Sequence, residues 1–449
     1  MLLPSTARSL RHKLVHGQVL GRAPSMAGAV VRGSQSIWSH TISTTLDTQF
    51  RIGSLTKTFV AILVMRLGDE GSINLEDRID RYLGDTQLGE LTVRQVLSHM
   101  SGLTAEPPGP WWERTAGALR PALGDVLGDE PIRHPAGKCF HYSSTGYAAL
   151  GVLIETVRGK SWTEVLHEEV LSPLGMFRTG HVPTSPYAQG WSVHPWADVV
   201  LPEVVVDVGL MGPAGQLWST IEDLCRFASF LLGNGGSVLR PETLAEIRTP
   251  QVAPVDNKWT TNYGLGLQVR RLQERVLSGH TGSMPGFVCA LWVDPEEQLG
   301  SIVLANTTAN VPIGTLTAEL LHLVAEQEPF IPEPWKPATN IDSSLLTMAG
   351  VWYWGPSPYS IRVLQDNILE LAPLSGRAGR GAQFTPQPNG IWLGESGYFA
   401  GETLQPVRDE PNGKVSHVDI GSFIFTREPY EPTGVIPGGV DPDGWRSGS

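Results

Sequence analysis

Apolar and polar residues alternate in two short runs near the N-terminus, MAGAVVRG and SIWSHTIS, which a short Gly-Ser turn separates. Alternation of this kind around a turn predicts a β-hairpin. Before the hairpin, residues 5–20 place apolar side chains at helical spacing and predict an amphipathic helix that Ser5 could cap. Residues 54–70 predict a second, more apolar helix that directly follows the hairpin region.

Between about residues 75 and 255 the apolar spacing is mostly helical, with long loops rich in Pro, Gly and Trp. After Tyr263 the pattern returns to strands, YGLGLQVRR, RVLSGH, GFVCALWVD and LGSIVLAN, and the helix GTLTAELLHLVAEQ closes the section. The first hairpin can join these strands only if the helical middle is an insertion. The sequence thus predicts an α+β domain over 1–327, with a sheet part (about 1–74 and 256–327) and a helical insertion (about 75–255).

The segment EPFIPEPWKPATN, residues 328–340, contains four prolines and predicts a linker, because proline continues neither a helix nor a central strand. Beyond it, residues 341–449 hold short runs rich in aromatic and β-branched residues, among them GVWYWG, YSIRVLQ and SFIFTRE. These runs predict a separate antiparallel β-domain, either a sandwich or a barrel.

Composition narrows the class of partner. The net charge is −12 and there is no run of Lys or Arg, which argues against nucleic acid. The longest apolar run, residues 59–65, is too short to cross a bilayer, and the N-terminus lacks the apolar stretch of a signal peptide. The chain has three cysteines, Cys139, Cys225 and Cys289, and no CxxC spacing. An odd number of cysteines without this spacing favours buried free thiols in a reducing compartment. We therefore expect a cytoplasmic protein that acts on a small molecule, with neither membrane nor nucleic acid as partner; its oligomeric state stays open.

Ser54 and Lys57 stand three residues apart at the start of the second helix. This spacing places both side chains on one face, where an uncharged amine can accept the serine proton. Ser54 could equally be a helix cap with Lys57 on a solvated first turn. The spacing alone does not decide between these interpretations.

Two further stretches carry chemistry. Tyr142, in FHYSSTGYAALG, precedes an amphipathic helix and could relay a proton to a leaving group, or simply pack the helix start. The second stretch, His280-Thr281-Gly282-Ser283, ends a predicted strand. There Gly282 would admit a substrate close to the backbone, and the N–H of Ser283 could form an oxyanion hole with that of Ser54.

The three stretches together, in this order, resemble the serine β-lactamase and penicillin-binding protein superfamily. That family carries Ser-x-x-Lys, then Tyr-x-Asn, then Lys-Thr-Gly or His-x-Gly. The resemblance is closest to its class C-like branch of esterases, D-aminopeptidases and acyltransferases. It extends over about residues 5–327 and includes FRIGSLTKTFVA, LSHMSGL, YGLGL and GHTGSMPGF. The C-terminal β-domain resembles the lipocalin-like barrels that some members append.

The resemblance implies a role for each matching residue. Ser54 would be the acylated nucleophile and Lys57 its activator, and Tyr142 would share the base role and protonate the leaving group. His280 would line the strand that faces the substrate, with Thr281 and Gly282 beside it. Whether Lys57 or Tyr142 is the base stays open.

Two positions depart from the family pattern. Ser144 stands where the family usually has Asn, and His280 stands where β-lactamases have Lys. The shorter hydroxyl weakens recognition of a penicillin-like side chain, and histidine lacks a fixed charge for a substrate carboxylate. Both departures argue against a true β-lactamase. Trp111 and Trp112, in a loop of the helical insertion, either line an acyl pocket or pin the loop.

The expected function is acyl transfer through an acyl-enzyme at Ser54 on a small ester, amide or peptide. The acceptor would be water in a hydrolase, or an amine or alcohol in a transacylase of antibiotic biosynthesis. The alternative is a non-catalytic ligand-binding or sensor protein with the same fold. We expect no cofactor and no metal site, since His12 and His16 share a helix face without a third ligand.

Overall fold

The computed structural model describes residues 2–84, 86–115, 122–234, 238–252, 259–331, 334–374, 380–395, 397–408, 414–431 and 433–435. The chain forms two compact units, Met1–Ile331 and Pro332–Ser449. The boundary falls within the proline-rich segment 328–340. The last residues of the expected C-terminal domain, 436–449, lie outside the described residues.

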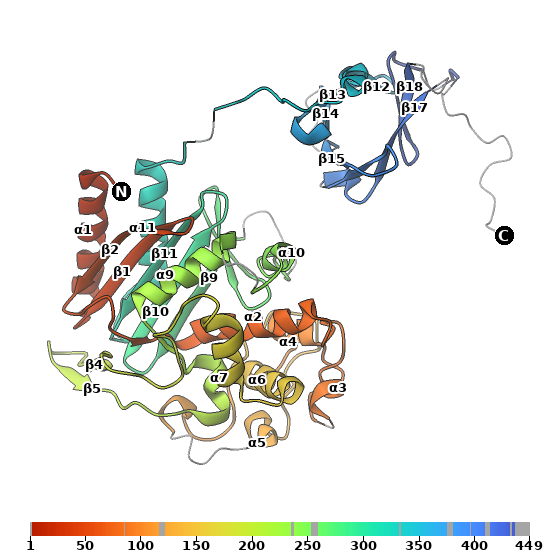
Figure 1. Ribbon diagram of the computed structural model, residues 1–449. Helices are drawn as coiled ribbons and strands as arrows, with labels where there is room; N and C mark the ends of the chain where they lie inside the picture. The colour runs from red at the N-terminus through yellow and green to blue at the C-terminus, as the bar shows by residue number, and fades with distance from the viewer. Residues whose placement is uncertain are drawn as a thin grey trace. The chain divides into compact units, whose positions relative to one another are not determined.

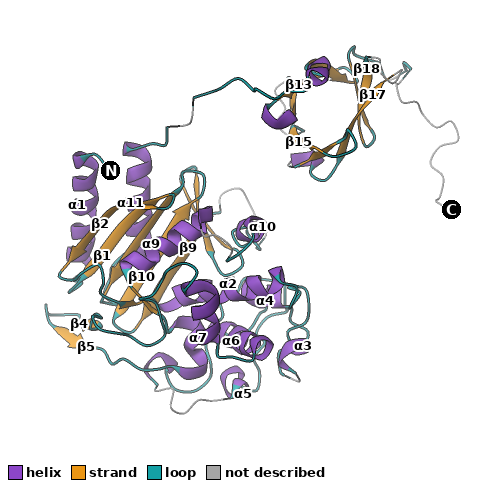
Figure 2. Cartoon of the chain, in the orientation of Figure 1, coloured by secondary structure: helices purple, strands orange, loops and turns teal. Residues whose placement is uncertain are grey.

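An antiparallel sheet of seven strands forms the centre of the first unit (Figures 1 and 2). In spatial order its strands are β2 (Gln35–Ile42), β1 (Met26–Arg32), β11 (Leu299–Ala305), β10 (Phe287–Asp294), β9 (Arg275–Met284), β8 (Gln268–Leu272) and β7 (Thr261–Tyr263). The N-terminal hairpin joins the later strands through β1 and β11, which pair antiparallel. The α+β arrangement inferred from the sequence, a sheet built from both ends of the region, is confirmed.

Helices cover both faces of this sheet (Figure 2). On one face, α1 (Pro4–Gly21) and α11 (Ile313–Gln327) bury a cluster that includes Leu14, Val303 and Leu320. On the other face, α9 (Ile221–Ser229) packs against β1 and β11, and α2 (Thr56–Asp69) leads into the helical part. Burial on both faces explains why the central strands are almost continuously apolar.

The helical part contains mainly short helices among long loops. Its remaining helices are α3 (Asp80–Leu83), α4 (Val93–Leu97), α5 (Leu123–Leu127), α6 (Ser144–Arg158), α7 (Trp162–Leu166), α8 (Gly212–Gly215) and α10 (Pro241–Glu246). Two small strand pairs accompany them, β3 (Phe50–Arg51) with β6 (Trp218–Ser219) and β4 (Trp191–Val193) with β5 (Val200–Pro202).

Three local expectations were wrong. Ser5 lies inside α1, whose N-cap is Leu3, and proline at the first helical position starts the helix instead. The run YGLGLQVRR is a hairpin, because β7 ends at Tyr263 and β8 begins at Gln268. The range 75–255 is not one insertion, since α9 inside it covers the main sheet.

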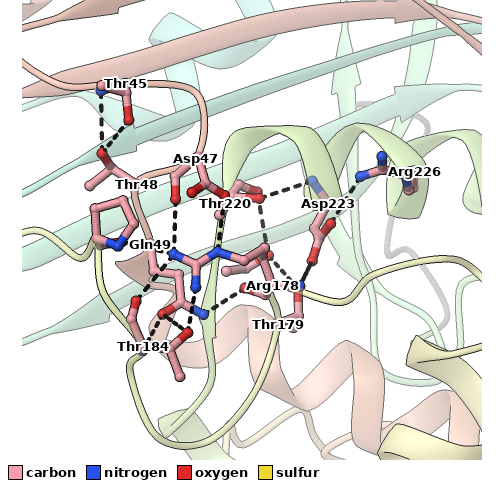
Figure 3. Close-up of polar contacts among 12 residues, drawn as sticks. Thr45, Asp47, Thr48, Gln49, Arg178, Thr179, Thr184, Thr220, Asp223 and Arg226 are labelled. Atoms are coloured by element: carbon pink, nitrogen blue, oxygen red, sulfur yellow. Dashed lines mark hydrogen bonds and ion pairs between the residues drawn. The ribbon is translucent and has the colours of Figure 1, made fainter.

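A polar network holds the chain where it enters β3 and the residues that follow (Figure 3). Arg178 Nε donates to Asp47 Oδ1 at 3.0 Å, and the backbone N–H of Arg178 donates to Asp223 Oδ2 at 2.8 Å. Gln49 bonds the same segment through its amide, which donates to the Arg178 carbonyl and accepts from Thr184 N–H. These bonds tie the start of α9 to the strand that immediately precedes Ser54.

The second unit is a closed antiparallel barrel. Its strands are β12 (Gly350–Trp354), β13 (Ser357–Val363), β14 (Leu369–Pro373), β15 (Ala382–Pro386), β16 (Trp392–Gly394), β17 (Thr403–Arg408), β18 (Val415–Ile420) and β19 (Phe423–Thr426). Of the two expected alternatives, sandwich and barrel, the structure has the barrel. Its interior is filled by apolar side chains such as Trp352, Phe384 and Phe425.

In the described part of the chain, no helix is both long and apolar enough to cross a membrane. Cys139, Cys225 and Cys289 are all free thiols. Only Cys289 is fully buried, so the expectation of buried thiols holds for one of the three.

Candidate active site

Ser54 lies in a single 3₁₀ turn, Gly53–Leu55, directly before α2, and Lys57 lies in the first turn of α2. The expected helix therefore begins two residues later than its sequence pattern indicated. The spacing still brings the side chains together, because Lys57 Nζ is 3.1 Å from Ser54 Oγ. The solvated-turn interpretation is wrong, since the Lys57 side chain is 0% exposed.

The surroundings of Lys57 favour its neutral form. Its Nζ donates to the Ala214 carbonyl at 2.8 Å and lies 4.9 Å from the centre of the Tyr142 ring. Burial lowers the pKa of Lys57 to about 7, although the carboxylates of Glu106 and Glu113 act in the opposite direction. Near neutral pH a large share of this amine is therefore unprotonated and able to accept a proton.

Tyr142 lies between Lys57 and the start of α6. Its hydroxyl is buried and makes no well-formed hydrogen bond within the described residues. Burial raises the pKa of Tyr142, an effect that the nearby Ser54 hydroxyl partly offsets. The side chain is therefore a phenol at neutral pH, with its hydroxyl beside that of Ser54.

The backbone of Ser283 lies against the serine turn. A Cβ on Gly53, whose φ is +51°, would be 2.5 Å from Ser283 N, so only glycine allows this approach. Met284 pairs with Phe287 across a two-residue loop, which makes the next pair, Ser283 and Val288, a non-hydrogen-bonded one. The Ser283 N–H consequently points away from β10, toward an edge of β9 that β8 leaves at Gly279.

His280 is buried and uncharged. It is 1% exposed, its Nδ1–H donates to the Thr281 carbonyl, and its Nε2 accepts from the Tyr263 hydroxyl at 3.1 Å. Burial lowers the pKa of His280 to about 3, and the Lys57 charge acts in the same direction. The centre of its ring lies 6.2 Å from that of the Tyr142 ring.

The neighbours of His280 have structural contacts of their own. Thr281 bonds Gln268 through its N–H at 3.3 Å. Gly282 does not leave room for a substrate as expected, because a Cβ there would be 1.9 Å from the Ile52 carbonyl oxygen. That glycine allows β9 to pack against the residue before Gly53.

Ser144 and Trp112 meet at Glu106, whereas Trp111 has a different partner. Ser144 Oγ donates to Glu106 Oε1 at 3.2 Å, and Trp112 Nε1 donates to Glu106 Oε2 at 2.6 Å. Trp111 is 58% exposed and donates to Glu113 Oε2 at 2.9 Å. Trp112 packs against the core, whereas Trp111 lies on the surface.

Sequence reasoning missed Glu106 and His99 as members of the site. His99, in LSHMSGL, is 0% exposed, and its Nδ1 accepts the Ser143 N–H at 3.0 Å. Its ring packs against that of Tyr142 with the centroids 4.2 Å apart and the planes tilted by 34°. Its φ is +58°, which is rare for a residue with a side chain. The signal was present, because LSHMSGL was recognised as a motif and only its histidine went unassigned.

A pocket of about 320 Å³ adjoins Tyr142 and is lined by Phe140, Tyr142, Tyr263, Asn262 and Gln268, among others. Larger cavities elsewhere, for example one of about 800 Å³ between α1 and α11, contain none of the residues described around Ser54. His12 and His16 border that cavity with stacked rings. Among the described residues no group of three or more His, Cys, Asp or Glu side chains is placed to hold a metal ion.

Comparison with known proteins places this geometry in context. The protein-family model described as Beta-lactamase matches residues 11–326, and a domain of unknown function, DUF7586, matches residues 341–427. Beta-lactamase-like protein 2 of Dictyostelium discoideum is 28% identical over 69% of this chain and 63% of its own length. Penicillin-binding protein 4 of Amycolatopsis lactamdurans is 26% identical over 59% of this chain and 74% of its own length. The matches thus span between just over half and three quarters of these and other curated relatives.

Solved structures share the fold. The D-amino acid amidase of Ochrobactrum anthropi superimposes with a TM-score of 0.62 at 21% identity, over 72% of this chain and 98% of the amidase. The octameric penicillin-binding protein homologue of Pyrococcus abyssi gives a TM-score of 0.60 at 20% identity, over 93% of this chain and 99% of its own.

Proposed function

The chain belongs to the Beta-lactamase family, and on this premise we propose that it is a serine hydrolase that forms an acyl-enzyme at Ser54. The substrate would be a small amide, ester or peptide, and water would take the acyl group. One observation carries the proposal: a fully buried lysine amine, its pKa lowered to about 7, lies 3.1 Å from a serine hydroxyl. A buried amine has no evident structural use that would offset its desolvation.

Acylation would begin with proton transfer from Ser54 Oγ to neutral Lys57 Nζ, while Oγ bonds to the carbonyl carbon. The N–H groups of Ser54 and Ser283 would stabilise the oxyanion. When the bond to the leaving group breaks, the Lys57 proton would pass through the Tyr142 hydroxyl to that group. We assign the base role to Lys57, because burial raises the pKa of Tyr142 and keeps it a phenol.

Deacylation would repeat the sequence with water. Lys57 would take a proton from water as its oxygen adds to the acyl carbon, and Ser54 would recover its proton as the acid departs. An amine or alcohol in place of water would make the same intermediate serve a transacylase. The neutral His280 and the Ser144 hydroxyl both support a substrate other than a penicillin-type carboxylate.

Labelling of the intact protein with a fluorophosphonate tests the proposal. Mass spectrometry should show one adduct on the native chain, located on Ser54, and none on Ser54→Ala. Ser34→Ala, in the exposed turn between β1 and β2, is the matched control and should be labelled like the native protein. Absence of an adduct, or equal labelling of Ser54→Ala, would refute the acyl-enzyme and leave the non-catalytic alternative. Adding an amine acceptor then separates hydrolysis from aminolysis of the same acyl donor.

A further inference from the structure

One end of the barrel brings together four side chains that are distant in the sequence. Trp354 ends β12, Arg380 precedes β15, Tyr398 lies between β16 and β17, and Phe423 begins β19. Consecutive strands pair antiparallel, so the end of each even-numbered strand and the start of the next strand lie at the same end of the barrel. These four residues form what we call the rim cluster.

Three aromatic rings lie around the guanidinium group of Arg380 in the rim cluster. Its Cζ is 4.8 Å from the centre of the Trp354 ring, 5.0 Å from that of Tyr398 and 5.4 Å from that of Phe423. A cation within about 6 Å of a ring centre is attracted by the negative face of the ring. The ring centres are 4.9 Å apart for Trp354 and Phe423, and 5.7 Å apart for Tyr398 and Phe423. The rings therefore form an aromatic box around a cation.

The backbone holds this box together. Gly397 has a φ of +69°, and a Cβ there would be 2.8 Å from the Gly381 carbonyl oxygen. Glycine thus allows the residue before Tyr398 to lie against the residue after Arg380. Trp354 and Phe423 pack on the apolar cluster of the barrel interior, whereas Tyr398 is 55% exposed. The box is anchored on the barrel interior and reaches the solvent at Tyr398.

The contacts of Arg380 differ from those of an arginine that closes the opposite end of the barrel. Arg427 lies 3.9 Å from the centre of the Trp352 ring and also donates to the Ala349 and Val351 carbonyls. Arg380 makes no hydrogen bond or ion pair with any described residue, although its guanidinium carries five N–H donors. The box consequently holds Arg380 by its charge and not by its hydrogen-bond donors.

We propose that the rim cluster is a binding site for a small molecule with a trimethylammonium group, and that Arg380 occupies the site until this ligand displaces it. A quaternary ammonium carries a positive charge but no N–H group, so a box of rings satisfies it without an acceptor. Arg380 is partly exposed, and rotation of its side chain toward the solvent is enough to free the box. The site is independent of the acyl-enzyme at Ser54.

Choline and its uncharged analogue 3,3-dimethyl-1-butanol have the same shape and test whether the box recognises charge. Saturation-transfer NMR on the full chain should show choline binding through its methyl signal. The dissociation constant of the analogue should be higher by about tenfold or more, because the attraction between the charge and the rings is lost. Equal binding of the two compounds, or no binding of choline, would overturn the proposal.

Substitutions of Tyr398 test the contribution of the rings. Tyr398→Leu should weaken choline binding by about tenfold or more, whereas Tyr398→Phe keeps the ring and should bind choline like the native protein. Tyr398 is the most exposed ring of the box, which favours folding of both variants. Equal affinities in the native protein and Tyr398→Leu, or an equal loss in Tyr398→Phe, would overturn the role of the ring.

Substitution of Arg380 tests whether it competes with the ligand. Arg380→Ala should tighten choline binding by about tenfold, because the box is then no longer occupied by the protein itself. Arg362→Ala is the matched control, since Arg362 is an exposed barrel arginine paired with Glu370, and it should keep the native affinity. Unchanged or weaker binding in Arg380→Ala would overturn the assignment of Arg380 as a competing occupant.

Vesicles of dioleoylphosphatidylcholine distinguish a free ligand from a lipid headgroup, which carries the same trimethylammonium group. The native protein should stay in the supernatant when the vesicles are sedimented. Sedimentation with the vesicles that is lost in Tyr398→Leu and kept in Tyr398→Phe would assign the box to a membrane surface and overturn the proposal of a small-molecule ligand.

Discussion

The cleft of the first unit and the interior of the barrel are built on opposite principles. Around Ser54 the protein buries Lys57, His99 and His280, each 1% exposed or less. The barrel interior is a continuous apolar cluster that includes Trp352 and Phe384. Of the described barrel residues, His417 and Thr426 are the polar ones that are buried.

This difference indicates where selection for chemistry outweighs selection for stability. Burying an ionisable group destabilises the fold unless it is neutralised or paired, and the cleft contains several such groups within a few ångströms of one another. The barrel contains the packing that stability alone favours. Function should therefore be sensitive to substitutions in the cleft that leave stability intact, and the barrel should show the reverse.

Replacing Lys57 with methionine should cause the largest loss of activity. Lys57→Met should reduce acylation by p-nitrophenyl acetate by about 10³-fold or more, because the base is lost, as burst kinetics would measure. In the native protein the same assay should show an acid limb near pH 7, since protonation of Lys57 removes the base. Near-native acylation in the variant would exclude Lys57 as the base.

Lys57→Met should at the same time raise the melting temperature. Burial lowers the pKa of Lys57 in the folded protein to about 7. The native protein is therefore most stable above the pKa that Lys57 has in the unfolded chain, and it loses this stability as the pH falls to about 7, because the unfolded chain binds the proton more readily. The gain in the variant should therefore be larger near about pH 6 than near about pH 10, which scanning calorimetry can measure. A lower melting temperature of the variant at both pH values would contradict the view that burial of Lys57 destabilises the fold.

Gly53→Ala should have the next largest effect on activity. The new Cβ would lie 2.5 Å from Ser283 N and force the two backbone segments apart, which removes the oxyanion site. Loss of one oxyanion donor typically lowers kcat by about 10²–10³-fold, and a loss of that order is expected here.

Gly71→Ala is the matched control for Gly53→Ala. Gly71 has a φ of +73° but no atom within 4 Å of its Cβ position, so alanine there brings backbone strain without a clash. Both variants should unfold at lower temperature, and only Gly53→Ala should lose acylation. Equal loss of acylation in the two variants would attribute the effect to strain rather than to the contact with Ser283.

A smaller effect is expected at His99. His99→Phe keeps a ring against Tyr142 but leaves the Ser143 N–H without its acceptor, which shifts the tyrosine relative to Ser54. We expect kcat to fall by about tenfold with KM nearly unchanged, the signature of a positioning residue. His99→Asn restores an acceptor near the position of Nδ1 and tolerates the positive φ, so it should recover part of the loss. No recovery in His99→Asn would show that the ring alone matters.

The sequence was informative about residues that act through local spacing and less so about contacts between distant segments. Ser54 and Lys57 are one helical turn apart, so their meeting follows from helix geometry. The contact of Glu106 with Ser144 joins a loop of the helical part to the start of α6, and no periodicity in the sequence encodes it. The sequence pattern placed Gly282 beside the substrate, because glycine allows another group to come close to the backbone. In the structure the group that comes close is the carbonyl of Ile52.

The fold of the barrel, too, could be predicted only in part from the sequence. Its aromatic runs predicted strands, but both the sandwich and the barrel satisfied the pattern, since closure depends on the pairing of β12 with β19. Two of its strands, β15 and β17, each contain a proline and at most one aromatic residue, and the sequence pattern did not identify them.

The smallest effect on activity is expected from the barrel itself. Trp352→Ala removes a side chain that is 0% exposed and whose indole donates to the Met348 carbonyl at 2.6 Å. Emptying such a site should destabilise the barrel by about 3–5 kcal/mol and lower its unfolding transition. Because the catalytic groups belong to the other compact unit, acylation of Ser54 at a temperature below that transition should stay within about twofold of the native rate. Leu371→Ala, a smaller deletion in the same cluster, should reproduce the pattern with a milder loss of stability. A fall in acylation that tracks the two losses of stability would mean that the barrel contributes to the reaction, and the comparison between a chemical cleft and an inert barrel would fail.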